Sequence, residues 1–296
     1  MTDLPKRLTP EIAWEQVQRA RHPQRPRALG YINGLCTEFV PLHGDRLFGD
    51  DAALIGGVGR FNGRSVMLLG HQRGADTKEN VRHNFGMPKP EGYRKAKRLM
   101  AQAERFGFPL ITFIDTPAAD PSLPSEERGQ ALAIAESILA MLGLRVPTIS
   151  VVIGQGGSGG ALAIGVTDRI IMMQNAIYSV APPESAASIL KLDPAKKQEV
   201  AAAMRITGAE STLFGVIDEV VPEPVPAHED PLDAIDTVGN AIERHLAALD
   251  AAYGVGTDVD IPHLLADRYA KYRNVGQWID EKSERGSHEG RRVDGL

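Results

Sequence analysis

The sequence predicts an α/β fold in which stacked ββα units follow one another in a spiral. Two β-rich runs flank the dipeptide Asn62-Gly63, which is typical of a tight hairpin turn. Short, uninterrupted apolar runs at 109–115 and 146–153 predict strands that are covered on both faces, and helical patterns separate them. Hairpins, single strands and helices in this order favour such a spiral over the strict βαβ alternation of a doubly wound sheet.

The first 48 residues are predicted to form an N-terminal helical segment. Thr9 is a candidate N-cap, and Pro10 suits the first turn of a helix. We expect this helix to run to about Arg21, because the proline-containing stretch 22–26 cannot continue it.

A β-hairpin and a long helix are predicted next. Residues 53–61 and 64–70 are the expected strands of the hairpin, because the Asn-Gly dipeptide between them tolerates positive φ angles. From Pro90 to about Phe106, apolar side chains recur at helical spacing with Lys and Arg on the other side. Gly107 is placed to end this helix.

A buried strand and a second helix are expected in the middle of the chain. The strand at 109–115 should end at Thr116-Pro117. Ser125 is the expected N-cap of a helix that continues to Gly143. The inward-facing stripe of this helix is predicted to consist of four apolar residues, Ile134, Ile138, Leu139 and Leu142.

The main domain is predicted to span residues 49–280, and five further elements complete it. We expect a short helix, two strands and two further helices, at 159–166, 169–174, 177–180, 231–252 and 262–272. The last stretch, 281–296, is charged, contains glycine and has almost no large apolar residue. It is predicted to be a disordered tail.

The composition excludes several classes of protein. Of the 296 residues, 43% are hydrophobic and 24% are charged, which is enough apolar content for a substantial core. The net charge of -5 and the pI near 5.9 lack the basic excess that nucleic-acid binding requires. Cys36 is the only cysteine, so this chain alone forms neither a disulfide nor a thiolate-based zinc site, and we expect it to hold no metal.

Neither the N-terminal residues nor the hydropathy pattern indicates an export or membrane segment. The start, MTDLPKRLTP, lacks the apolar core of a signal peptide. No window approaches the ~18 apolar residues that predict a membrane span. We therefore expect a cytoplasmic protein without membrane contact.

The glycine cluster at 153–161 is the most informative stretch of the sequence, and three interpretations of it are considered. Gly154, Gly156 and Gly159 satisfy the pattern G-x-G-x-x-G between a strand and a helix, as dinucleotide binding requires. The following helix is short, however, and the next strand ends in Gln-Asn where a carboxylate should meet the ribose. A P-loop is excluded because no Lys-Ser or Lys-Thr closes the cluster.

The same cluster fits the nucleophile elbow G-x-S-x-G of a serine hydrolase. Ser158 would be the nucleophile, and Asp218, His228 and His263 follow it in the chain order of such a triad. Glycine-rich stretches match this pattern easily, and neither histidine stands in a context that indicates a positioned base.

The third interpretation is an oxyanion hole made of backbone amides. Peptide N–H groups in a glycine turn that opens a helix point toward one spot, and the helix dipole adds to their partial positive charge. Removal of one such donor typically costs ~3–4 kcal/mol of transition-state stabilisation. The alternative is a glycine turn that only permits close packing of the helix on the strand.

Several irregular motifs are shared with a known family. The longest are Gly70-His-Gln-Arg-Gly74, the run at 82–88, Pro90-Glu-Gly-Tyr-Arg-Lys95 and the glycine-rich run at 156–165. Shorter matches occur at 20–26, 113–117 and 126–130. On these residues the chain, over about 9–275, resembles the carboxyltransferase alpha subunits of bacterial acetyl-CoA carboxylase.

The resemblance implies a crotonase-like fold and an α2β2 assembly with a zinc-carrying beta subunit. The implied reaction is transfer of the carboxyl group of carboxybiotin to acetyl-CoA, which gives malonyl-CoA for fatty-acid biosynthesis. Biotin would arrive on a biotin carboxyl carrier protein that works with biotin carboxylase, and would not be attached to this chain.

The resemblance also implies a set of site residues. The family holds the ureido oxygen of biotin on two adjacent glycine amides, which correspond here to Gly159 and Gly160. Four cations, Lys78, Arg82, Arg94 and Lys95, are candidates for contact with the phosphates of CoA or with acidic groups of a partner, the alternative being a solvated helix face or a surface ion pair. Further candidates for substrate binding lie in the glycine turn and after the buried strand, namely Gly156, Gly157, Ser158, Thr116 and Pro117.

The chain departs from the family pattern beside this proposed site. Residues 118–122 replace a loop that has glycine and tyrosine, Gln155 replaces a glutamate, and 183–186 replace a run with glycine and cysteine. One alternative is therefore a divergent subunit that no longer turns over and keeps a role in assembly. His71, just beyond a predicted strand, is interpreted as a histidine satisfied by neighbouring backbone and not as a catalytic residue.

Overall fold

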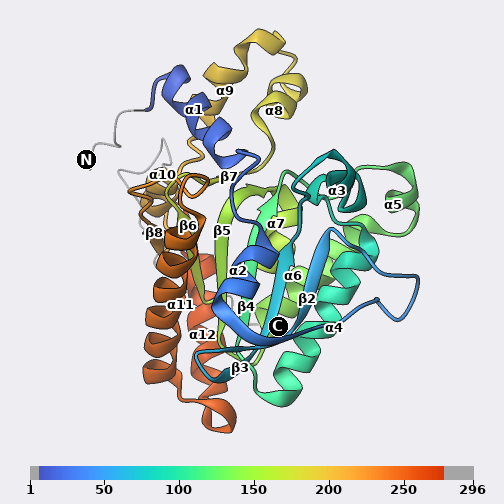
Figure 1. The fold of residues 1–296 in the computed structure, drawn as a ribbon, viewed down its shortest axis with the longest axis vertical. Coiled ribbons are helices and arrows are strands. Elements are labelled where there is room, and N and C mark those ends of the chain that lie inside the picture. The colour runs from blue at the N-terminus through green and yellow to red at the C-terminus, as the bar shows by residue number, and fades with distance from the viewer. Residues whose placement is uncertain (1–6, 277–296) are drawn as a thin grey trace, which may run out of the picture.

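The computed structural model describes residues 7–276, and its centre is one eight-stranded sheet (Figure 1). Along the sheet the strand order is β1-β2-β3-β4-β5-β6-β8, and β7 pairs with β5 outside this path. The strands are β1 (Cys36–Pro41), β2 (Leu54–Phe61), β3 (Arg64–His71), β4 (Leu110–Thr116), β5 (Thr148–Gly157), β6 (Arg169–Met173), β7 (Ile177–Ser179) and β8 (Glu219–Val221).

The sheet changes from antiparallel to parallel pairing after its third strand. β1 pairs with β2 and β2 with β3 in antiparallel fashion, and all later pairs are parallel. Asn62 and Gly63 join β2 to β3 with φ angles of 48° and 80°, so the predicted hairpin turn is confirmed. Because the strand order follows the chain order, the chain advances across the sheet as the predicted α/β spiral does.

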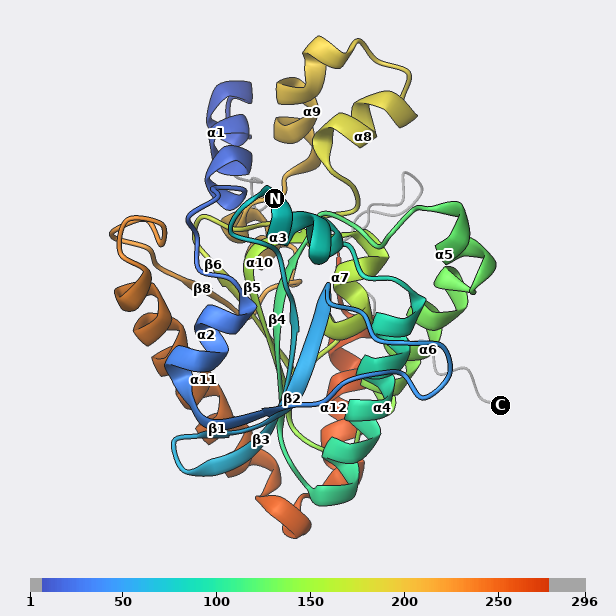
Figure 2. The same ribbon diagram turned by 45° about the vertical axis from the view of Figure 1, so that its right-hand side comes forward.

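Helices cover both faces of the sheet (Figure 2). α2 and α11 contact strands on one face, and α4, α6 and α7 pack together on the other. The helices of eight residues or more are α1 (Pro10–Ala20), α2 (Ala28–Leu35), α4 (Pro90–Phe106), α6 (Gln130–Gly143), α7 (Ser158–Gly165), α9 (Lys197–Met204), α11 (Pro231–Tyr253) and α12 (Ile261–Arg273). The shorter ones are α3 (Thr77–Arg82), α5 (Leu123–Glu127), α8 (Pro183–Ile189) and α10 (Gly208–Leu213).

The capping residues of two helices act as predicted. The Thr9 hydroxyl accepts a hydrogen bond from the Ile12 amide at the start of α1, at 3.4 Å. Gly107 ends α4 in the left-handed conformation with a φ of 65°. Both signals are local, which is why the sequence alone was sufficient to place them.

The helix predicted from Ser125 to Gly143 is instead two helices, α5 and α6. The break lies at Gly129, whose φ of 79° cannot continue a helix. Ser125 is not the N-cap, because its hydroxyl donates to the Asp120 carboxylate at 2.6 Å. Leu139 is 69% exposed, so its predicted inward orientation was wrong.

The packing of α6 explains the exposure of Leu139. The buried face of α6 consists of small or flexible residues, including Ala133, Ser137 and Met141. The Ser137 hydroxyl donates to the carbonyl of Ala163 in α7 at 2.7 Å. Of the predicted stripe, Ile134, Ile138 and Leu142 are half-buried and pack against the main core, and only Leu139 faces away from it.

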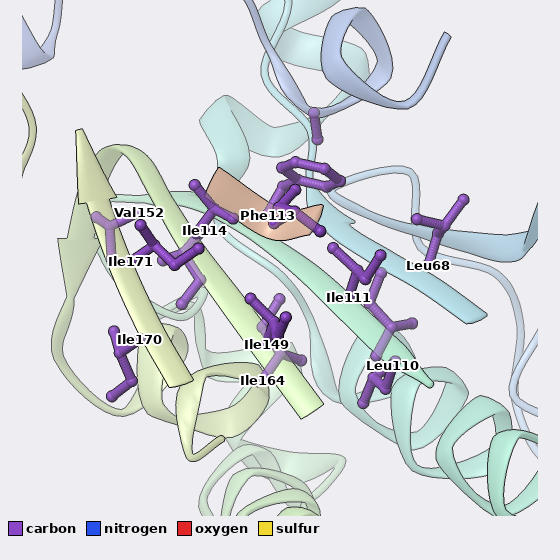
Figure 3. Close-up of a cluster of buried hydrophobic side chains, with 14 of the residues drawn as sticks. Leu68, Leu110, Ile111, Phe113, Ile114, Ile149, Val152, Ile164, Ile170 and Ile171 are labelled. Atoms are coloured by element: carbon purple, nitrogen blue, oxygen red, sulfur yellow. The ribbon is translucent and has the colours of Figure 1, made fainter. Parts of the chain in front are cut away.

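The main hydrophobic core lies between the parallel strands and the helices (Figure 3). Side chains of β3 to β6 and of α7 meet there, and all of the labelled residues are almost completely buried. They are Leu68, Leu110, Ile111, Phe113, Ile114, Ile149, Val152, Ile164, Ile170 and Ile171. β4 and β5 are buried along their whole length, as the two uninterrupted apolar runs predicted.

The N-terminal segment is tied to the sheet by a buried ion pair. Arg25 donates to the Glu223 carboxylate at 2.8 Å and to the carbonyl of Ile153 in the middle of β5, at 3.0 Å. α1 packs on α9 in a smaller second core at one end of the molecule (Figure 1). β1 belongs to the sheet, and the predicted segment boundary at residue 48 stays a prediction.

A second buried network closes the Thr148 end of β5. Arg268 of α12 donates to both carboxylate oxygens of Asp168, at 2.7 and 2.8 Å, and also to four carbonyls at the end of α6 and in the segment before β5. The Asp168 carboxylate in turn accepts from the Thr148 amide and hydroxyl. The predicted tail at 281–296 lies outside the described residues. Within the described part, none of the helices has the length and apolar character that a membrane crossing requires.

Candidate functional site

The candidate site lies where three neighbouring parallel strands end. β3 ends at His71, β4 at Thr116 and β5 at Gly157, after which α7 begins directly. Because β3, β4 and β5 are parallel neighbours, their carboxyl ends share one edge of the sheet. This edge is the usual position for a ligand in sheets of this kind.

The glycine turn presents the first amides of α7 without a side-chain cap. Gly157 is the N-cap residue and can offer no side chain. Ser158, Gly159 and Gly160 begin the helix, so their N–H groups have no acceptor within it. Ser158 and Gly159 are half-buried and Gly160 is buried. Amides of this kind at the start of a helix are the donors from which an oxyanion hole can be built.

Close packing accounts for some of the glycines but not for all. A Cβ atom at Gly156 would strike the Tyr178 ring, and one at Gly157 would strike the Pro117 carbonyl. At Gly160 it would lie 2.7 Å from the Ala119 amide nitrogen. At Gly159 its nearest neighbour would be the Ile134 side chain at 3.4 Å, an ordinary contact. Packing alone therefore does not require glycine at position 159.

Thr116 and Pro117 lie beside the glycine turn, and their role in substrate binding stays a prediction. The Pro117 carbonyl faces the α-carbon of Gly157. The Thr116 hydroxyl donates to the Ala118 carbonyl at 2.7 Å, which folds the loop back on itself. The backbone of Ala118 and Ala119 then covers Gly160.

Asp120 anchors the loop at 118–122, where the chain departs from the family pattern. Its carboxylate accepts hydrogen bonds from the hydroxyls of Ser122 and Ser125, both at 2.6 Å. Burial alone would raise the pKa of Asp120, but these donors lower it below its usual value. The altered loop is thus held by its own charge-assisted hydrogen bonds.

Arg21 connects the altered position 155 to the segment at 183–186, through Glu184, the glutamate that precedes the altered residues there. The Arg21 guanidinium donates to the Gln155 side chain at 2.8 Å and to the Glu184 carboxylate at 2.6 Å. Gln155 belongs to the glycine cluster and Glu184 to α8, so Arg21 joins these two elements to α1. Glu184 has a pKa below its usual value, chiefly because of the hydrogen bond from Arg21.

His71 and Tyr93 are two residues that the sequence analysis did not place in the site. Both are fully buried, and the hydroxyl of Tyr93 would lie 3.0 Å from a Cβ atom at Gly160. The His71 ring interacts with the backbone of Gly160, in keeping with the expected contact to backbone, and no side chain among the described residues bonds to its nitrogens. Both residues stand in shared motifs, but no local pattern indicated that these motifs converge.

The two candidate cations on α3 lie at the same edge of the sheet but not in the turn. Lys78 and Arg82 are exposed, and neither forms a hydrogen bond or ion pair with the glycine cluster in the described structure. Their suggested contact with phosphates or with a partner stays a prediction.

The serine-hydrolase triad is not assembled. His228 stacks on His22 with ring centroids 3.7 Å apart, and His263 pairs with Asp267. Asp218 is the ion-pair partner of Lys271. Between residues 7 and 276, no hydrogen bond joins Ser158 to a histidine, and no cluster of His, Cys, Asp or Glu is suited to a metal ion.

Comparison with known proteins identifies the family. Residues 3–276 match a family model described as acetyl co-enzyme A carboxylase carboxyltransferase-like. The chain belongs to this family. A carboxyltransferase alpha subunit of acetyl-CoA carboxylase from Prochlorococcus marinus is 51% identical over 276 residues, which cover 93% of this chain and 79% of the relative. The subunit of the same name from Heliobacterium modesticaldum is 50% identical over 97% of this chain and 83% of its own length.

Solved carboxyltransferase structures share the fold at lower identity. A transcarboxylase 12S structure with methylmalonyl-coenzyme A bound superposes with a TM-score of 0.60 at 20% identity, over 78% of this chain and 44% of the other. A Pseudomonas malonate decarboxylase heterotetramer in complex with coenzyme A gives 0.60 at 19% identity, over 84% and 96%. These neighbours are crotonase-like, so the predicted fold class of this carboxyltransferase is confirmed.

Proposed function

We propose that this chain is the alpha subunit of an acetyl-CoA carboxylase carboxyltransferase and moves the carboxyl group of carboxybiotin to acetyl-CoA, giving malonyl-CoA for fatty-acid biosynthesis. The observation that carries the proposal is the start of α7, which has no side-chain cap and where the amide of the half-buried Gly159 is followed by that of the buried Gly160. Family membership and the crotonase-like fold support it.

The amides of Gly159 and Gly160 would receive the ureido oxygen of biotin. The turn suits this group because the first amides of α7 lack a side-chain cap and no side chain at 159 or 160 screens them. Carboxybiotin supplies an activated carboxyl group, and its departure leaves negative charge on the ureido oxygen. Donors that are already aimed at that charge stabilise the transition state more than the ground state.

The remaining candidates would shape the pocket around this donor pair. Gly156 and Gly157 let the strand end approach Tyr178 and Pro117, and Ser158 starts the helix with a φ of 55°. Thr116 and Pro117 form the wall that faces them. Lys78 and Arg82 would meet phosphates of CoA or acidic groups of a partner.

The proposal includes a division of labour between subunits. We expect a carboxyltransferase beta subunit in an α2β2 assembly to carry zinc and to bind the thioester. A biotin carboxyl carrier protein and biotin carboxylase would deliver the carboxyl donor. We place the assembly in the cytoplasm, which suits a chain whose buried cysteine, Cys36, is free.

The alternative is a divergent subunit that assembles without turnover. It is motivated by the changes at 118–122 and at 183–186, which lie against Gly160 and against Arg21. The first of these loops is nevertheless held by a complete set of hydrogen bonds to Asp120. The geometry therefore favours the catalytic subunit.

Copurification with candidate beta subunits tests the proposal. We expect the purified complex to form malonyl-CoA from acetyl-CoA and carboxybiotin, and the isolated chain to form none. Full activity of the isolated chain would overturn the division of labour. A complex that assembles but does not turn over would establish the alternative.

A further inference from the structure

Two fully buried polar side chains from different elements converge on Gly160. His71 ends β3 and Tyr93 lies in the first half of α4, and both have 0% exposure. The hydroxyl of Tyr93 has no hydrogen-bond partner within the described chain, and the His71 ring has a backbone interaction with Gly160 but no side-chain partner there. The two residues are distant in sequence, so only the fold brings them to the same glycine.

Three groups lie close to the position that a Cβ atom of Gly160 would take. A Cβ atom there would lie 3.0 Å from the Tyr93 hydroxyl, 2.7 Å from the Ala119 nitrogen and 3.0 Å from the Ala118 carbonyl carbon. The His71 ring interacts with the backbone of the same glycine. Gly160 is therefore enclosed by the Tyr93 hydroxyl, the 118–119 backbone and the His71 imidazole.

Packing does not explain why these two residues are polar. Folded proteins leave few buried polar atoms without a partner, because the lost hydration is not repaid. A phenylalanine ring would fill the Tyr93 position with similar volume and without this cost, and an apolar side chain would likewise avoid it at position 71. Conflicts of this kind are expected where function and not stability selects the residue.

We propose that His71 and Tyr93 are positioning residues, which hold the Gly160 peptide and thereby fix the direction of the amide donors at the start of α7. The inference rests on the proposed function of these donors.

The ionisation of both groups agrees with this role. Burial lowers the pKa of the His71 imidazole to about 3, and the Gly160 backbone offsets this only in part. Burial, together with the negative charges of Asp51 and Asp120, raises the pKa of the Tyr93 hydroxyl well above its usual value. Both groups stay neutral at physiological pH, so they orient the turn without competing with its amides for negative charge.

Two variants that each remove one tyrosine hydroxyl, one near each end of β5, give a matched test. Both are measured in the purified complex with the beta subunit. Tyr93→Phe is expected to leave the melting temperature unchanged or raise it, and to lower kcat ~10-fold or more with KM for acetyl-CoA unchanged. The control is Tyr272→Phe, since the Tyr272 hydroxyl donates to the Thr167 carbonyl at 2.8 Å, away from the site. This control is expected to lower the melting temperature and to leave kcat unchanged.

A second pair of variants tests the imidazole. His71→Phe should lower kcat in the same way, and His71→Gln, which keeps an amide donor, should retain more activity than His71→Phe. Wild-type values of kcat in both Tyr93→Phe and His71→Phe would overturn the inference. So would losses of kcat that follow losses of melting temperature. An inactive wild-type complex would instead refute the proposed function, so the two failures are distinguishable.

Discussion

The two ends of β5 handle their buried polar groups in opposite ways. At the Thr148 end, the Arg268 guanidinium and the Asp168 carboxylate are fully paired with each other, with Thr148 and with nearby carbonyls. At the Gly157 end, the buried Tyr93 hydroxyl has no partner among the described residues, and the His71 ring has no side-chain partner beside its interaction with the Gly160 backbone. The same strand thus connects a region built for stability with a region whose residues stability does not explain.

This contrast follows from what each end must do. Buried charges are tolerated only when every donor and acceptor is paired, and the network around Arg268 meets that condition. A site that receives transient negative charge must instead keep donors free until the charge develops. Variants at the Thr148 end should therefore lose stability and keep turnover, whereas variants at the Gly157 end should lose turnover and keep stability.

The largest effect on stability is expected for Arg268→Met. The change leaves the buried Asp168 carboxylate without its partner, which typically costs ~3–5 kcal/mol of the free energy of unfolding. Urea denaturation of the purified complex measures this loss. Turnover per folded complex should not change, because Arg268 is remote from the glycine turn.

The control for Arg268→Met is Lys97→Met, which breaks the exposed ion pair between Lys97 and Glu136. Exposed pairs typically contribute only ~0–1 kcal/mol. Equal losses in the two variants would mean that the buried network does not support the fold as the geometry implies.

Gly160→Val should have the largest effect on turnover. Its Cβ atom would press on the Ala118–Ala119 backbone, and we expect kcat to fall ~100-fold or more, which corresponds to about 2.7 kcal/mol of transition-state free energy. Malonyl-CoA formation by the complex measures the rate, and copurification checks that assembly persists.

Gly143→Val is the matched control, because a Cβ atom at Gly143 meets nothing within 4 Å. This variant should turn over at the wild-type rate. An unchanged kcat for Gly160→Val would mean that the glycine turn only permits close packing of the helix on the strand.

The smallest effect, and the sharpest comparison, comes from Thr148→Val. The Thr148 hydroxyl donates to the Asp168 carboxylate at 2.8 Å and accepts from the Asp168 amide at 2.9 Å. Its removal should cost ~1–3 kcal/mol of stability. Tyr93→Phe also deletes one buried hydroxyl and should cost no stability. Equal melting temperatures for these two variants would therefore contradict the proposed difference between the ends of β5.

Local features of this fold were predictable, and features that depend on neighbouring elements were not. The hairpin at Asn62-Gly63 and the end of α4 at Gly107 depend on the φ angles of a few residues. The orientation of Leu139 depends on how closely α6 approaches α4 and α7. Ser125 does not cap a helix, because its hydroxyl donates to the Asp120 carboxylate. Neither of these contacts is encoded within the helix itself.

The sequence by itself determined the glycine turn, because glycine composition between a buried strand and a helix is enough to predict exposed amide donors. It also determined the family, through motifs too long and irregular to match by chance. Only the tertiary structure decided what surrounds the turn. His71, Tyr93 and the loop at 118–122 come from different elements, and side chains so distant in sequence meet at Gly160 only because parallel strands bring their carboxyl ends to one edge of the sheet.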